Sequence, residues 1–194
     1  MSKLENHQGF SPESSYHYFF SRENSDHYFQ RLREETPWKQ ETIKLYGKKV
    51  DIPRLTAWFG DPGTTYRYSG ITVRPLPWTK SLLQIKREIE SVSGAMFNSA
   101  LLNLYRDGRD GVSWHSDDEP ELGQDPVIGS VSFGETRKFQ LCRKRKPEIK
   151  NELFLSHGSY LIMKGPTQHN WQHQVPKQTL LKKPRINLTF RLVS

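Results

Sequence analysis

The sequence contains little sulfur: its 194 residues include one cysteine, Cys142, and three methionines. A single cysteine excludes a disulfide within the chain, and such low usage is typical of proteins from the reducing interior of a cell. The sequence also has no apolar run long enough to cross a bilayer, and its first residues do not form a signal-peptide pattern. We therefore expect a protein without a membrane partner, which is cytoplasmic in a bacterium or nuclear in a eukaryote.

Acidic residues are in deficit. Asp and Glu total 21 against 29 Lys and Arg, which gives a formal net charge of +8 at pH 7. Basic side chains release counterions when they bind phosphates, so this surplus favours a polyanionic partner such as nucleic acid. Charge alone leaves a second interpretation open, a basic soluble protein without such a partner.

The length of the chain suits one domain with a sizeable core. Residues 1–24 are rich in Ser, Glu, His and aromatic residues without a clean period, and we expect them to form a partly disordered N-terminal extension. Residues 25–194 are expected to form the single folded domain.

Two segments carry helix start and stop signals. Ser25 is expected to cap a first helix that ends before Pro37, and Thr79 a second helix that Gly94 closes. After Gly94 we expect short strands near residues 98–105, 112–115, 127–133, 138–141, 159–163, 171–175 and 186–192. Many short strands in succession indicate a mainly β (α+β) protein, a sandwich, barrel or jelly roll. We expect a jelly roll supported by the N-terminal helices.

The densest group of metal-ligand residue types is Trp-His-Ser-Asp-Asp-Glu at residues 114–119. Alternate residues of a strand point the same way, so His115 and Asp117 can present a nitrogen and a carboxylate to one point. His173, on a later strand, is the best third ligand by its position. Two histidines and one carboxylate leave open positions on iron(II). A zinc hydrolase, or two surface residues in an acidic turn, would explain the pair equally well.

The last expected strand alternates polar and apolar residues. Arg185, Asn187, Thr189 and Arg191 share its polar face. A guanidinium binds a carboxylate in bidentate fashion, and two guanidiniums inside a barrel would be unfavourable without anions. A dicarboxylate cosubstrate would supply both anions, whereas an outward polar face would leave two exposed arginines on an edge strand.

Six blocks of the sequence occur in an order that resembles a known family. They are residues 98–105, 114–119, 130–134, 157–159, 171–173 and 184–191. Together they resemble the AlkB family of 2-oxoglutarate dioxygenases, most of all its eukaryotic-type DNA-repair members and their bacterial relatives. The resemblance runs from about Pro53 to the C-terminus. It implies a double-stranded β-helix, which is a jelly roll, and it implies iron(II), 2-oxoglutarate and O2 as cofactor, cosubstrate and oxidant.

The resemblance also implies roles for individual residues. The implied iron ligands are His115, Asp117 and His173. The two carboxylates of 2-oxoglutarate would be held by Arg185 and Arg191. Further hydrogen bonds to the same molecule would come from Asn103, Tyr105 and Asn187.

The implied activity is the oxidative demethylation of alkylated nucleobases, such as 1-methyladenine and 3-methylcytosine, as a direct reversal of DNA damage. DNA, single- or double-stranded, is the expected partner, with RNA as a second candidate, and the protein is expected to be a monomer. Two alternatives remain: an oxygenase of the same chemistry that acts on protein or a small molecule, and a non-catalytic reader of alkylated nucleic acid. The basic charge opposes the first alternative and the intact ligand set opposes the second.

Residues 65–70 resemble the nucleotide-recognition lid of this family, and the resemblance implies such a lid at about residues 41–78. A base must leave the stack to be oxidised, and Tyr66 and Tyr68 in this lid could sandwich it against His115. The faces of their rings would attract a cationic methylated base. If the two tyrosines only pack on a strand, they have no such role.

Two more residues are expected to contact the substrate. Tyr46, at the tip of a hairpin, would fill the gap left by a flipped base, unless it only packs on the surface. Asp118 is expected to act in catalysis and substrate binding through the exocyclic amine or the cationic ring. It could instead orient Arg191 or be solvated.

Overall fold

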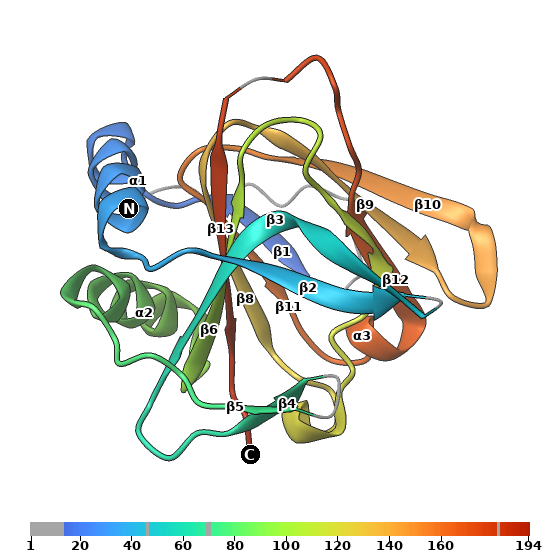
Figure 1. Cartoon of the computed structure of the whole chain (residues 1–194), viewed down its shortest axis with the longest axis horizontal. Helices are drawn as coiled ribbons and strands as arrows, with labels where there is room; N and C mark the ends of the chain where they lie inside the picture. The colour runs from blue at the N-terminus through green and yellow to red at the C-terminus, as the bar shows by residue number, and fades with distance from the viewer. Residues whose placement is uncertain (1–13, 46, 69–70, 182) are drawn as a thin grey trace.

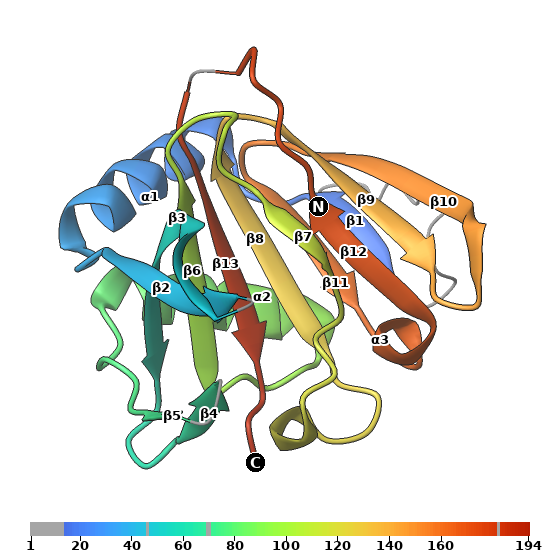
Figure 2. The ribbon, with the colours of Figure 1, turned by 45° about the vertical axis from the view of Figure 1, so that its right-hand side comes forward.

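The computed structural model describes residues 14–45, 47–68, 71–181 and 183–194. Two antiparallel sheets form the centre of this part of the chain, and the two long helices, at residues 22–35 and 80–93, cover the outer face of the larger sheet (Figures 1 and 2). This arrangement confirms the mainly β jelly roll supported by N-terminal helices.

The larger sheet has seven strands. Their order is β1 (Ser15–Tyr18), β11 (Ser159–Met163), β8 (Ile128–Gly134), β13 (Arg185–Arg191), β6 (Ser99–Tyr105), β3 (Lys48–Gly60) and β2 (Lys39–Leu45). The last strand of the chain, β13, therefore lies between β6 and β8 near the middle of the sheet.

The smaller sheet has four strands. Their order is β10 (Lys146–Leu155), β9 (Arg137–Arg143), β12 (Trp171–Val175) and β7 (Val112–His115). A separate ribbon consists of β4 (Tyr66–Tyr68) and β5 (Ile71–Val73). The segment expected to form a lid, residues 41–78, is thus divided: β2 and β3 extend the larger sheet, and β4 and β5 stand apart.

Two helices with polar caps precede most of the strands. The hydroxyl of Ser21 caps α1 (Arg22–Glu35), and Thr79 caps α2 (Lys80–Ser93), as predicted for the second helix. The first cap was predicted at Ser25, which is wrong. Ser25 lies within α1, fully buried, and its hydroxyl donates to the Ser21 carbonyl at 2.7 Å. None of the helices in the described ranges is both long and apolar enough to cross a membrane.

Residues 15–24 lie within this fold. Strand β1 pairs with β11 at the edge of the larger sheet, and its Tyr16 is buried between the sheets. The boundary expected between residues 24 and 25 falls inside α1.

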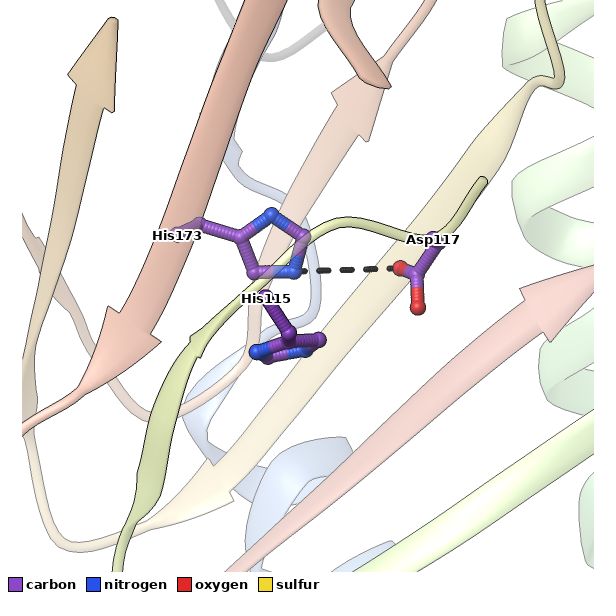
Figure 3. Close-up of side chains that lie close together, drawn as sticks. All are labelled: His115, Asp117 and His173. Carbon is purple, nitrogen blue, oxygen red and sulfur yellow. Dashed lines mark ion pairs between the residues drawn. The ribbon is translucent and has the colours of Figure 1, made fainter. Parts of the chain in front are cut away.

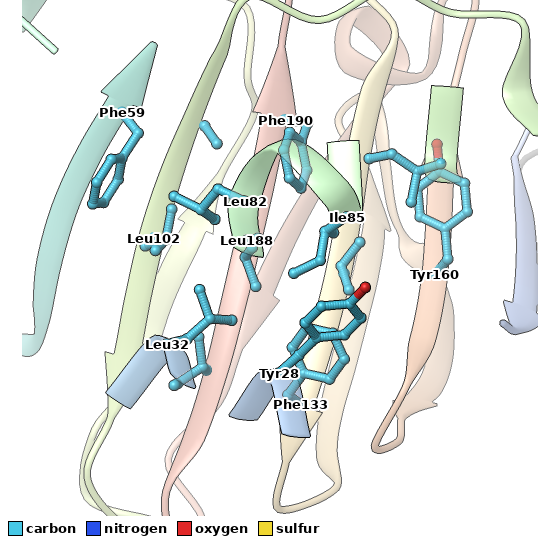
Figure 4. Packing of buried hydrophobic residues seen from close by; sticks show 14 of the residues in the cluster. Tyr28, Leu32, Phe59, Leu82, Ile85, Leu102, Phe133, Tyr160, Leu188 and Phe190 are labelled. Carbon is cyan, nitrogen blue, oxygen red and sulfur yellow. The ribbon is translucent and has the colours of Figure 1, made fainter. Parts of the chain in front are cut away.

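The larger sheet separates two hydrophobic cores. Tyr28 and Leu32 of α1, with Leu82 and Ile85 of α2, pack on its outer face (Figure 4). Strand β13 contributes Ile186, Leu188 and Phe190 to that core. The second core lies between the two sheets. Because successive strand residues point to opposite faces, the polar residues of β13 face the space between the sheets. This excludes the outward polar face.

Candidate active site

The three candidate metal ligands come from neighbouring strands of the smaller sheet. His115 ends β7, Asp117 follows it, and His173 lies on β12 opposite His115 in the strand register. One ligand atom from each side chain lies within 4.8 Å of the other two. Figure 3 shows how the side chains gather around one point. Two imidazoles and one carboxylate on one side of an ion leave the remaining coordination positions open.

The protonation states of these residues suit a divalent cation. Burial, aided by the neighbouring His115, lowers the pKa of His173 to about 3, so its imidazole is neutral near pH 7. Burial alone would raise the pKa of Asp117. Its interactions with Arg191 and the two histidines outweigh burial, so the pKa of this carboxyl lies below its ordinary value. Neutral imidazole and charged carboxylate are the forms that bind metals.

The ring nitrogens also have free positions for a ligand. His115 Nδ1 lies 2.8 Å from the backbone oxygen of Ser113. Since a carbonyl oxygen only accepts, Nδ1 donates this hydrogen bond, which leaves Nε2 as the ring nitrogen available to a metal. His173 Nε2 lies 3.8 Å from Asp117 Oδ2, too far for a hydrogen bond, and His173 Nδ1 is buried without a partner in the described part of the chain. Such unsatisfied buried atoms are uncommon, and they fit a site that is completed by an ion.

Arg191 connects β13 to the metal-ligand set. Its Nη2 donates to Asp117 Oδ1 at 2.5 Å, and both side chains are almost fully buried. A charge-assisted hydrogen bond of this kind is strong. It fixes one carboxylate oxygen and leaves Oδ2 on the side of His173. Asp118 does not orient Arg191; Asp117 occupies that position.

A cavity between the two sheets begins at these ligands. Four of the five side chains expected to bind 2-oxoglutarate line it together with His115, Asp117 and His173. These four are Asn103, Tyr105, Asn187 and Arg191. Asn187 already donates to Ser130 Oγ at 2.9 Å and to the Val131 carbonyl at 3.0 Å.

Arg185, the fifth of these side chains, does not line the cavity but packs against Tyr105, which does. Its guanidinium carbon is 5.1 Å from the centre of the Tyr105 ring, and the residue is 1% exposed. Nη2 donates to Ser132 Oγ at 2.9 Å. Nε and Nη1 are buried and have no hydrogen-bond partner in the described part of the chain.

Among the described residues, no acid balances the charge of Arg185. Burial lowers the pKa of this guanidinium to about 10, so it remains charged at neutral pH. The charged or polar groups that influence its pKa are Tyr105, Arg137 and Tyr16, and none of them is a carboxylate. A buried cation without a counter-ion is strongly unfavourable. The site therefore fits a ligand that brings a carboxylate to Arg185.

Arg54 is a cavity residue that the sequence patterns did not mark as part of the site. It extends from β3, lines the cavity, and donates through Nε to Asn103 Oδ1 at 2.7 Å. In the segment Arg54-Leu55-Thr56-Ala57 the residues alternate between the inner and outer faces of the sheet, and Ala57 packs in the helix-side core. This period of two could have placed Arg54 on the inner face.

The sequence profile of the 2OG-Fe(II) oxygenase superfamily matches residues 14–191. The chain belongs to this superfamily. Iron(II), 2-oxoglutarate and O2 are thus the cofactor, cosubstrate and oxidant of its family, which confirms the expected set. The curated relatives that resemble this chain include several AlkB homologues, which confirms the expected resemblance.

Alpha-ketoglutarate-dependent dioxygenase alkB homolog 3 of Homo sapiens is 47% identical over 177 residues, which cover 84% of this chain and 60% of the relative. DNA oxidative demethylase ALKBH2 of Mus musculus is 40% identical over 158 residues, covering 78% and 66%. The chain thus spans about 60% of the length of the first curated relatives it matches. The solved structure of OsALKBH1 superimposes with a TM-score of 0.68 at 15% identity, covering 95% of this chain and 99% of that one. This likeness shows the fold.

The structure leaves the expected contacts between the substrate and Tyr46, Tyr66, Tyr68 and Asp118 untested. Asp118 follows the ligand Asp117, but its half-exposed carboxylate pairs with Lys144 Nζ at 2.9 Å. Tyr66 and Tyr68 belong to β4 of the separate ribbon. Tyr46 lies outside the described residues. The contacts of these residues with a base stay predictions.

Proposed function

We propose that this member of the 2OG-Fe(II) oxygenase superfamily removes methyl groups oxidatively from nucleobases in DNA, with 1-methyladenine and 3-methylcytosine as its substrates. The observation that carries the chemistry is a cavity lined by His115, Asp117 and His173 and by Tyr105. The buried guanidinium of Arg185 packs on Tyr105, and none of the described groups that influence its pKa is a carboxylate. The support for the substrate class is twofold: relatives named as DNA oxidative demethylases, and the net charge of +8.

The residues have distinct tasks in this proposal. His115, Asp117 and His173 hold iron(II), which when bound with 2-oxoglutarate activates O2 for oxidation of the alkyl carbon. Arg191 keeps the Asp117 carboxylate charged and turned towards the histidines. Arg185 supplies the charge that binds and orients a carboxylate of the cosubstrate. Its burial excludes water, which strengthens that attraction.

The substrate base is proposed to reach the cavity after it leaves the stack. Its phosphates would contact exposed basic residues, which include Lys48 and Lys49 on β3. The Asp118 carboxylate stands at the edge of the metal-ligand loop, where a cationic methylated ring would be attracted. We propose DNA as the main partner and RNA as the alternative substrate that the experiment must include.

The test is a mass measurement on oligonucleotides that carry a single 1-methyladenine. Single-stranded DNA, duplex DNA and RNA are each incubated with the protein and O2, with and without iron(II) and 2-oxoglutarate. The expected result is the loss of one methyl mass that requires both additions, while succinate forms in parallel. A methylated peptide serves as the control substrate. Turnover of the peptide alone, or no turnover of any nucleic acid by folded, metal-bound protein, would overturn the proposal.

A further inference from the structure

The loop that carries Asp117 is held from behind by α3 (Thr167–Asn170), the short helix between β11 and β12. The amide of Asp117 donates to Gln168 Oε1 at 3.0 Å, and Gln168 is fully buried. The hydroxyl of Ser116 donates to the carbonyl of Trp171 at 2.9 Å. Two successive residues of the loop are therefore attached to the helix and to the residue that follows it.

A lysine side chain near the surface also links the Asp117 loop to α3. Lys144, in the turn between β9 and β10, donates from Nζ to Asp118 Oδ2 at 2.9 Å and to the Gln168 carbonyl at 2.8 Å. Its amide donates to the carbonyl of Asn170 at 2.8 Å. One ammonium group thus joins the residue after Asp117 to the residue that binds the Asp117 amide.

These contacts join two parts of the metal site that are separate in the sequence. Helix α3 leads directly into β12, which carries His173, whereas Asp117 lies beyond the end of β7. The pairing of β7 with β12 aligns the two histidines but does not include Asp117. Arg191 fixes the side chain of Asp117, and Gln168 fixes its backbone.

We propose that Gln168 and Lys144 are positioning residues of the metal site, which hold the Asp117 loop against the start of β12 so that Asp117 and His173 can bind one ion. The inference rests on the proposed metal-binding role of the triad. Groups behind metal ligands commonly set affinity in this way, and their loss weakens binding or activity by about 10- to 100-fold. The buried amide of Asp117 needs an acceptor, and Gln168 Oε1 supplies it.

The experiment measures the affinity of the folded protein for Co²⁺, followed by the visible absorption of the ion, so that it does not depend on turnover. Gln168→Met keeps the size of the side chain but removes the acceptor, and we expect it to weaken Co²⁺ binding by about 10- to 100-fold. Lys144→Met should weaken it by about tenfold. Lys144→Arg keeps a cationic donor and should restore most of the affinity.

Matched controls carry the same replacement nearby. Gln172 on β12 and Arg145 in the β9–β10 turn make no side-chain hydrogen bond or ion pair to other described residues. Gln172→Met and Arg145→Met should therefore leave Co²⁺ affinity within about twofold of the original. Thermal unfolding of each variant without metal shows whether the fold is intact.

The outcomes separate the inference from the proposed function. Unchanged Co²⁺ affinity in Gln168→Met and Lys144→Met, even with lower thermal stability, would show a purely structural role and overturn the inference. If Gln168→Met does not fold, the surface variant Lys144→Met decides the question alone. If the unsubstituted protein binds no Co²⁺, that result would overturn both the metal-binding role of His115, Asp117 and His173 and the positioning role of the residues behind them. One that binds Co²⁺ but does not demethylate would overturn only the proposed substrate.

Discussion

Arg137 on β9 and Arg185 on β13 are both 1% exposed, and both guanidiniums lie over the ring of Tyr105, at 5.5 and 5.1 Å. Their hydrogen bonds differ. Arg137 donates to three backbone carbonyls and to Gln178 Oε1. Arg185 donates to one hydroxyl, and two of its nitrogens have no partner among the described residues. Burial alone therefore does not distinguish a structural arginine from a ligand-binding one. The completeness of its hydrogen bonds does.

We expect the largest loss of activity when a metal ligand is replaced. Asp117→Ala should lower demethylation by more than about a hundredfold, because even the partners behind metal ligands are worth about 10- to 100-fold. Asp26→Ala, on the exposed side of α1, is the control and should retain activity. Turnover is measured by the oligonucleotide mass assay, and undiminished activity of Asp117→Ala would remove this residue from the metal site.

The next largest effect is expected on stability, when the structural arginine is replaced. Arg137→Met should lower the free energy of unfolding by about 3 kcal/mol, because it leaves buried carbonyls without donors. Urea denaturation measures this change. Arg143→Met, at the exposed end of the same strand, should change stability by less than about 0.5 kcal/mol. A cost for Arg137→Met no larger than that of the control would contradict its structural role.

Arg185→Met should give the opposite pattern. We expect the Kd for 2-oxoglutarate to rise about 10- to 100-fold, since a charge-assisted hydrogen bond is worth roughly 1.5–3 kcal/mol. Stability without cosubstrate should stay the same or increase, because the variant removes a buried charge that has no counter-ion. Calorimetric titration of the metal-loaded protein, together with urea denaturation, tests both parts. If Arg185→Met destabilises the protein as much as Arg137→Met does, the two arginines do not differ in kind.

The smallest effect concerns pH. Because burial lowers the pKa of His173 from 6.5 to about 3, the folded protein keeps this residue neutral while the unfolded chain protonates it below pH 6.5. Stability of the metal-free protein should therefore fall as pH drops from 6.5 towards 5, by about 1 kcal/mol per pH unit. Denaturation at pH 6.5, 5.5 and 5 measures this slope. His173→Gln should flatten it; an unchanged slope would assign the effect to other groups.

Strong local signals in the sequence were sufficient for much of the fold. Thr79 and Gly94 bounded α2, and strands were expected near β6, β7, β8, β9, β11, β12 and β13. Strand β10 was missed because most of its residues are exposed and four of its ten are charged, as is common in an edge strand, so its apolar alternation is weak. Ser25 was mistaken for a cap because Ser21 offers the same chemistry one turn earlier.

Less of the candidate site than of the fold could be predicted from sequence patterns. The alternation of β13 showed that Arg185 and Arg191 share a face, but not whether that face points inward, because this depends on which side the helices cover. The pairing of Arg191 with Asp117 joins residues 74 positions apart. Gln168 shows the same limit, since its partner lies 51 positions away and no local motif marks it.

The seven residues of β13 alternate between two faces: the apolar ones pack in the helix-side core, and the polar ones face the space between the sheets, where the cavity lies. In a saturation-mutagenesis survey of this strand, nearly every position should therefore be intolerant, but the damage should appear in two forms. Changes at Ile186, Leu188 or Phe190 should reduce the amount of intact protein in the cell, whereas changes at Arg185 or Arg191 should leave abundance high and activity absent. Measuring abundance and activity together would separate the two sets, with a period of two along the chain.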